Sequence, residues 1–150
     1  MKPSSVRVRL VTPALDGDVR ERRFGGGGPF AMRAGDWAGR TLDEVAAEDP
    51  AALHAWLTDP DFAPPGGESV TGLVARAGAW LTSLEPGTHR VEAADQAFVR
   101  ATVVHALDLP AAAFWRLDAR PRTAVELSGR AGRWNLRIGT PEGAADPSTA

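Results

Sequence analysis

The sequence predicts one α/β domain in which helices pack on a small mixed β-sheet. An alternating strand pattern opens the chain, helical and strand patterns alternate through its middle, and two strands joined by a glycine-rich turn end it. A length of 150 residues fits one domain, and fractions of 43% apolar and 24% charged residues are ordinary for a globular protein. We therefore expect a domain over residues 1–139 and a disordered tail over 140–150.

Composition excludes several classes of protein. The chain has no cysteine, so disulfides, thiolate metal sites and cysteine nucleophiles are ruled out. A net charge of -2 does not favour a nucleic-acid partner, and the sequence holds neither an apolar membrane span nor a secretory signal. Its three histidines lack metal-ligand spacing. We expect a cytoplasmic protein with no metal, no cofactor, no nucleic-acid partner and no membrane partner.

The first half of the chain predicts one strand and two helical regions. Residues 5–12 alternate apolar and polar side chains and end at a proline, as a strand does. A charged stretch without clear period follows, and then the run Gly25–Pro29, which predicts a flexible break. Thr41 to Glu44 form a capping box, so a helix should run to Thr58, split at Pro50. Its apolar face is expected to use five residues, Leu42, Val45, Leu53, Trp56 and Leu57.

The second half predicts two helices, one short helix and three strands. A helix is expected over 68–84 and a strand over 89–93, and Asp95 can cap a helix that runs to Leu107. Pro110 should open a short helix through Trp115. Strands over 123–128 and 133–138 should form a hairpin joined by residues 129–132. We expect strands 5–12 and 89–93 to lie side by side and parallel.

Three stretches, in this order along the chain, carry a family resemblance. Residues 20–24 read Arg-Glu-Arg-Arg-Phe, residues 34–44 contain Gly-Asp-Trp-Ala-Gly-Arg-Thr and continue into Pro-Pro-Gly-Gly-Glu-Ser within 61–69, and residues 98–117 form a helical stretch with Leu-Pro and Phe-Trp-Arg-Leu. Together they resemble the histidine phosphatase superfamily, the phosphoglycerate-mutase-like proteins. The resemblance implies a reduced form of that layered fold, with about four strands in a mixed sheet and a C-terminal antiparallel hairpin.

The same resemblance implies that this chain departs from the family at its catalytic positions. Counting without gaps places Thr12 at the phosphate-clamping arginine and Pro13 at the nucleophilic histidine. Ala31 falls at the general acid, and Asp95, followed by Gln96, at the second histidine. The strand that carries a second phosphate-binding arginine has no counterpart. Since phosphoryl transfer depends on neutralising phosphate charge, we expect a shortened member without phosphatase or mutase activity.

Asp95 is the candidate catalytic residue, and two interpretations of it stay open. It can be a plain helix cap, which aspartate does well. It can also be a carboxylate in a pocket at the carboxyl ends of the two parallel strands, where ligands bind in α/β sheets. The expected pocket residues beside it are Thr12, Pro13, Phe30, Trp37 and Gln96.

Two functions therefore remain open. The first is a pseudoenzyme that binds a small molecule or a partner protein. The alternative is a repurposed enzyme, an isomerase, cyclase, dehydratase or hydrolase of a biosynthetic pathway, with Asp95 as general acid or base on a substrate without phosphate. In either case the ligand should be neutral or cationic, because Asp95 would repel a phosphate dianion. A homodimer is expected, because the loss of a strand and a helix would leave apolar surface to cover.

Overall fold

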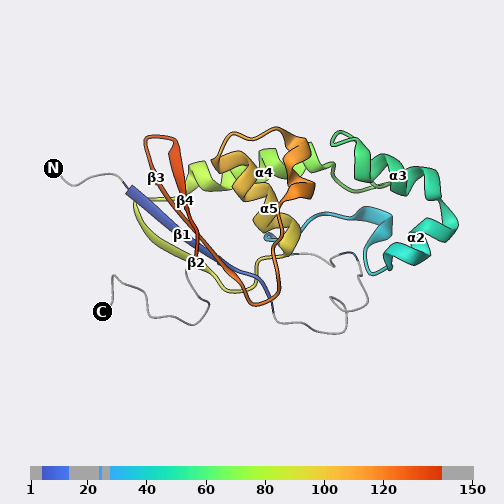
Figure 1. Cartoon of the computed structure of the whole chain (residues 1–150), viewed down its shortest axis with the longest axis horizontal. Coiled ribbons are helices and arrows are strands. Elements are labelled where there is room, and N and C mark those ends of the chain that lie inside the picture. Colours follow the sequence, from blue (N-terminus) through green and yellow to red (C-terminus); the bar gives the residue numbers. More distant parts are fainter. Residues whose placement is uncertain (1–4, 14–23, 25–27, 140–150) are drawn as a thin grey trace.

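The computed structural model describes residues 5–13, 24 and 28–139 and shows a four-stranded sheet with helices packed against one of its faces (Figure 1). This confirms the predicted α/β class. The elements are β1 Ser5–Val11, η1 Gly35–Trp37, α2 Leu42–Glu48, α3 Pro50–Thr58, α4 Val70–Ser83, β2 Gly87–Val91, α5 Gln96–Ala106, η2 Ala111–Arg116, β3 Ala124–Arg130 and β4 Arg133–Arg137. Within the described part of the chain, no helix is long and apolar enough to cross a membrane. The predicted tail over 140–150, the charged stretch before Phe24 and glycines 25–27 lie outside the described residues.

The sheet has the strand order β2-β1-β3-β4. Strands β1 and β2 are parallel, with Val8 opposite His89, as the sequence predicts. Strand β3 runs antiparallel to both β1 and β4. The carboxyl ends of β1 and β2 therefore meet at one edge of the sheet, which is where the chain continues into Pro13 and, through a short turn, into Asp95.

The inner face of the sheet packs on helices α4 and α5. Val8 and Leu10 of β1 and Leu127 of β3 are fully buried against Leu81 of α4 and Val99 of α5. This is the alternation expected of a half-covered strand, in which every second side chain faces the core. Helices α4 and α5 also pack closely along each other, so they form one rigid layer behind the sheet.

Helices α2 and α3 begin as the sequence predicts. The Thr41 hydroxyl accepts a hydrogen bond from the backbone N–H of Glu44 at 3.0 Å, which is the first half of the predicted capping box, and it donates to the Glu44 carboxylate at 3.2 Å. Pro50 opens α3, and Asp49 caps it by accepting from the backbone N–H of Ala52 at 3.1 Å. A helix that carried on through Pro50 would lose a backbone hydrogen bond, which is why the helical region splits there.

Three details of the prediction are wrong, and the predicted short helix after Pro110 is present with its type now defined. Leu57 does not join the buried face of α3, because 43% of its surface is exposed. Strand β2 covers 87–91 instead of 89–93, since pairing with β1 begins at Gly87 and ends where the chain turns toward α5. The short helix after Pro110 is a 3-10 helix. The hairpin strands extend to Arg130, so that only Ala131 and Gly132 form the turn.

Candidate functional site

A cavity of about 270 Å³ opens at the edge of the sheet where β1 and β2 end. Its floor is formed by Pro13, after β1, and by the first residues of α5, Asp95 to Ala97. Its walls come from α2, α3, η2 and the segment before η1. The remaining lining residues are Phe24, Met32, Ala34, Leu42, Trp56, Leu57, Arg100, Phe114 and Trp115. The described lining is therefore mostly apolar, with the polar side chains gathered on the first turns of α5.

Backbone hydrogen bonds fix the position of Asp95. The preceding residue, Ala94, donates its N–H to the carbonyl of Val11 at 2.9 Å, and Asp95 donates its own N–H to the carbonyl of Phe30 at 2.8 Å. The residue thus stands between the end of the sheet and the 28–34 segment. Asp95 occupies the N-cap position of α5, but its side chain makes no cap hydrogen bond of normal geometry. A plain cap is therefore an incomplete account of this carboxyl group.

The Asp95 carboxyl is harder to ionise than an ordinary aspartate. Burial raises its pKa, because a low-dielectric surrounding disfavours the charged form. The nearby backbone amides of Met32, Ala97 and Gln96, and the charge of Arg100, act in the opposite direction and are outweighed. A carboxyl with a raised pKa next to a cavity is suited to hold or exchange a proton.

Arg100 is the cationic member of the lining. Its Nε donates to the carbonyl of Leu117 at 2.8 Å, and its guanidinium carbon lies 5.8 Å from the centre of the Phe114 ring. Burial lowers the pKa of Arg100, while the charges of Asp118 and Asp95 raise it. Arginine stays protonated in any case. Asp95 and Arg100 thus place opposite charges on one helix, and they offset each other at the cavity floor.

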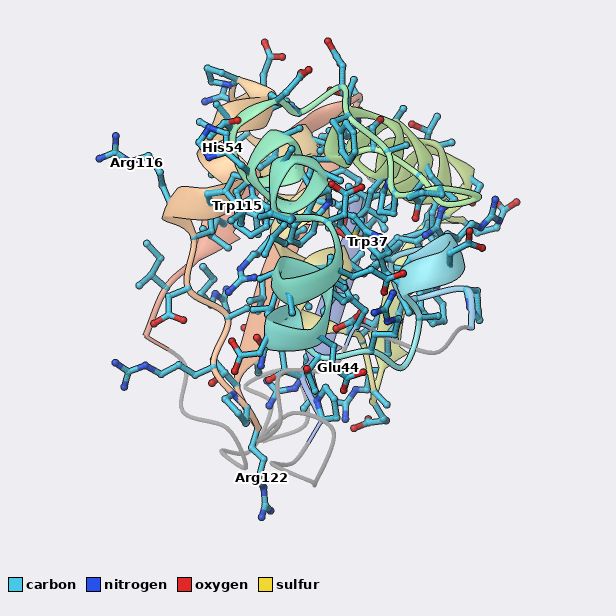
Figure 2. The ribbon with its side chains drawn as sticks, turned by 90° about the vertical axis from the view of Figure 1, so that its right-hand side faces the viewer. Trp37, Glu44, His54, Trp115, Arg116 and Arg122 are labelled. Atoms are coloured by element: carbon cyan, nitrogen blue, oxygen red, sulfur yellow. The ribbon has the colours of Figure 1, made fainter. Side chains whose placement is uncertain are left out.

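Aromatic rings form the wall opposite α5. The Trp56 and Trp115 rings meet edge to face with centroids 4.7 Å apart, and Phe24 packs on Trp56 at 5.2 Å. Figure 2 shows Trp115 and Trp37 inside the body of the molecule, whereas Arg116 and Arg122 project into solvent. The buried Nε1 of Trp56 has no hydrogen-bond partner among the described residues. Rigid aromatic walls of this kind suit a planar or apolar ligand surface.

The structure brings Pro13, Asp95 and Gln96 together at the cavity and places the other predicted pocket residues elsewhere. Thr12 is buried, and its hydroxyl hydrogen-bonds the carbonyl of Arg120 and the N–H of Thr123. Phe30 packs edge to face on Trp80 and Phe98 in the core. Trp37 also lies in the core, with 4% of its surface exposed. These three residues do not line the cavity. Hydrogen bonds hold the Thr12 side chain, and core packing holds the Phe30 and Trp37 rings.

The sequence analysis missed Arg100 and the η2 aromatic residues Phe114 and Trp115. Helical periodicity supplies a signal for Arg100, since positions 96, 97 and 100 share one face of a helix that begins at Asp95. No comparable local signal points to η2, which reaches the cavity only through the tertiary fold.

The three histidines of the sequence lie away from the described lining of the cavity. His54 lies exposed on α3, His89 on β2, and His105 near the end of α5. None of the three belongs to the lining, and the sequence has no other histidine. The described residues also hold no cluster of three or more His, Cys, Asp or Glu side chains that could bind a metal ion.

The mixed sheet, with helices on one face and a cavity at the carboxyl ends of two parallel strands, defines an α/β fold, and this edge is where such folds place their ligands. Over residues 31–138 the sequence matches the histidine phosphatase superfamily (branch 1). The chain belongs to the histidine phosphatase superfamily. Its 150 residues are consistent with a shortened member. Among curated proteins, none matches the sequence significantly.

Solved structures share this fold at low sequence identity. A mycobacterial hydrolase ("hydrolase 1") has a TM-score of 0.74 at 18% identity, over 92% of this chain and 99% of its own. A mycobacterial glucosyl-3-phosphoglycerate phosphatase in complex with VO3 has a TM-score of 0.72 at 19% identity, over 88% and 97%. A putative α-ribazole-5′-P phosphatase from Escherichia coli has a TM-score of 0.75 at 14% identity, over 94% and 98%. These likenesses concern the fold.

Proposed function

We propose that this protein is a histidine-phosphatase-like pseudoenzyme that binds a small, non-phosphorylated molecule in the cavity at the ends of β1 and β2. The observation that carries the proposal is the cavity floor, which presents Pro13 and Asp95 at the two strand ends. Proline has no nucleophile, and a carboxylate repels a phosphate dianion. The family resemblance implies the two catalytic histidines at these positions.

The chemistry of the cavity supports a neutral or cationic ligand with an apolar, planar body. Trp56, Trp115 and Phe114 offer ring surface, while the first turns of α5 offer the Asp95 carboxyl and the Gln96 amide for hydrogen bonds. The charge of Arg100 is opposed by Asp95 and Asp118. An apolar cavity with a few convergent polar groups is the usual form of a small-molecule site.

The first prediction concerns phosphatase activity. The purified protein should not hydrolyse p-nitrophenyl phosphate, and neither phosphate nor vanadate should raise its melting temperature, because the described lining has no histidine and a carboxylate at its floor. Turnover that persists through repurification and is removed by Asp95→Asn would contradict the proposal. An active histidine phosphatase measured in parallel serves as the positive control.

The second prediction concerns the cavity itself. N-phenyl-1-naphthylamine, an uncharged aromatic probe, should bind with one site per chain and a rise in fluorescence. Ala97→Phe places a ring in the cavity and should weaken that binding about tenfold or more, because the space is occupied. Ala79→Phe on the exposed face of α4 is the matched control and should bind the probe like the wild type. Equal binding by both variants would show that the probe sits elsewhere.

The repurposed enzyme remains the alternative, because burial raises the pKa of Asp95 in a cavity that can admit a substrate. Here Asp95 acts as the general acid or base. Carbodiimides activate protonated carboxyl groups, so mass spectrometry after reaction in mildly acidic buffer should find Asp95 modified faster than the exposed Asp118, because burial raises the pKa of Asp95. Modification of Asp118 alone would remove the basis of this alternative.

A further inference from the structure

The outer face of the sheet is rich in arginine, whereas the lining of the cavity is mostly apolar. The helices pack on the other face, so the side chains that alternate outward from the strands have no helix over them among the described elements (Figure 1). Six of these outward side chains are arginines. They are Arg7 and Arg9 on β1, Arg90 on β2, Arg130 on β3, and Arg133 and Arg137 on β4. We call this surface the arginine face.

Strand register concentrates the arginines into rows across the sheet. One row runs from Arg90 through Arg9 and Glu126 to Arg137. A second row places Arg7 between Thr88 and Ser128, and Arg130 lies opposite Arg133 in the hairpin. Like charges directly opposite each other destabilise a sheet. The pair Arg130–Arg133 therefore destabilises the hairpin, whereas Arg9 is neutralised by Glu126 in its own row.

One acidic residue lies among the six arginines on the outward positions of the described strands. Glu126 holds Arg9 at 2.6 Å and Arg137 at 3.6 Å. These three side chains line a hollow of about 50 Å³ together with Arg7, Arg90 and the hydroxyl residues Thr88 and Ser128. This is more space than one ordered water molecule needs, so a carboxylate oxygen can enter the hollow. Guanidinium and hydroxyl donors are the groups that bind such an oxyanion.

We propose that the arginine face is a docking surface for an extended acidic segment of a partner protein. In an extended chain, alternate side chains repeat about every 6.6–6.8 Å, as the outward positions of a β-strand do. Acidic side chains on one side of such a segment can thus meet the exposed guanidinium groups of the face, Arg7 among them, while Arg9 stays paired with Glu126. Arginine favours this because its planar fork binds a carboxylate through two hydrogen bonds.

A nucleic acid fits this surface less well. The outward positions of the described strands carry no aromatic ring on which a base could stack, and Glu126 sits in the middle of the longest row. The chain as a whole has a net charge of -2, whereas nucleic-acid-binding domains are strongly basic. A short acidic segment touches only the arginine face and does not meet the acidic charge elsewhere on the chain.

The test uses the full-length protein and a fluorescein-labelled oligoglutamate peptide, with binding followed by fluorescence anisotropy at low ionic strength. The wild type should bind the peptide, and the double variant Arg7→Glu, Arg133→Glu should bind about tenfold or more weakly, because two charges of the face are reversed. The matched control is Arg116→Glu, Arg122→Glu, which changes the net charge equally at exposed positions away from the face (Figure 2). It should keep most of the affinity.

A third variant gives a change in the opposite direction. Glu126→Gln removes the acidic group from the longest row and should tighten peptide binding several-fold. Circular dichroism melts establish that each variant is folded. The proposal is overturned if the wild type does not bind the peptide, if both double variants lose affinity equally, or if labelled oligothymidylate binds more tightly than oligoglutamate.

Discussion

Arg76 of α4 fastens the backbone segment that runs beside the cavity. Its Nη1 and Nη2 donate to the carbonyls of Pro29 and Ala31 at 2.8 and 2.5 Å, and its Nε and Nη2 reach the Glu68 carboxylate at 3.1 and 2.7 Å. The same carboxylate accepts the N–H of Arg33 at 2.8 Å. Because Phe30 in this segment accepts the hydrogen bond from Asp95, the Arg76 clamp sets one side of the candidate site.

The third prediction concerns the contribution of Arg76 to stability. Arg76→Ala should lower the free energy of unfolding by about 2–3 kcal/mol, because it leaves two carbonyls without their donor and the mostly buried Glu68 carboxylate without its cationic partner. Arg76→Lys should recover only part of this, since a single ammonium cannot reach all three acceptors. Urea unfolding measures both, with Arg116→Ala as a control expected to change stability by less than about 0.5 kcal/mol. A loss equal to that control would show that the clamp contributes nothing.

The sequence predicts where a residue lies along an element, but it does not predict which way an apolar ring points. The placement of Asp95 at the end of β2 follows from strand and helix patterns, and the structure puts it in the cavity lining. Phe30 and Trp37 were also expected in the pocket, but both rings point into the core. The sequence shows that a ring is apolar. It does not show which of two apolar surroundings, core or cavity wall, the ring will face.

At the scale of elements, the β3–β4 hairpin shows why the predicted turn was too long. Residues 129–132 contain two glycines, and both were assigned to the turn. Only Gly132 serves it, with φ of 79°. Gly129 lies inside β3, and a Cβ there would come within 2.5 Å of the Trp134 ring, so this glycine is needed for cross-strand packing. Local sequence cannot separate these two requirements for glycine.

The fourth prediction concerns the same turn. Ala131 has φ of 53°, which is the left-handed region of backbone conformation. Alanine is sterically disfavoured there, and asparagine adopts this conformation more readily. Ala131→Asn creates the Asn-Gly pair favoured in two-residue hairpins and should raise the free energy of unfolding by about 0.5–1 kcal/mol. Gly132→Ala should lower it by a similar amount or more. Thermal and urea melts of the two variants check this, and a destabilising Ala131→Asn would contradict the turn assignment.

For the molecule as a whole, the family motifs and the strand patterns were sufficient to predict the fold, because both persist when individual site residues change. The match over residues 31–138 and the parallel pairing of β1 with β2 confirm that part. The homodimer stays a prediction, but the apolar surface that a second copy was expected to cover is small among the described residues. The exposed large apolar residues of the described chain are Leu57, Leu107 and Ile138, on separate elements, and the outer sheet face is cationic instead of apolar.

The fifth prediction concerns the stability of the whole molecule as a function of pH. Burial raises the pKa of Asp95 above its ordinary value near 4, so between that value and the raised pKa the folded state holds a proton that the unfolded state has lost. Asp95 therefore lowers stability as pH rises through this window, and the cost is complete above the raised pKa. Asp95→Asn removes this dependence while keeping the shape of the side chain.

The melting temperature of Asp95→Asn minus that of the wild type should accordingly increase as the pH rises above about 4 and level off above the raised pKa. Differential scanning fluorimetry in a series of buffers of equal ionic strength measures this difference. Asp118→Asn, at an exposed position, is the control and should show no comparable trend. A difference that decreases with rising pH would mean that the amides of Met32, Ala97 and Gln96 outweigh burial. Asp95 would then be an ionised helix cap, and its role as a proton-holding group in the cavity would be lost.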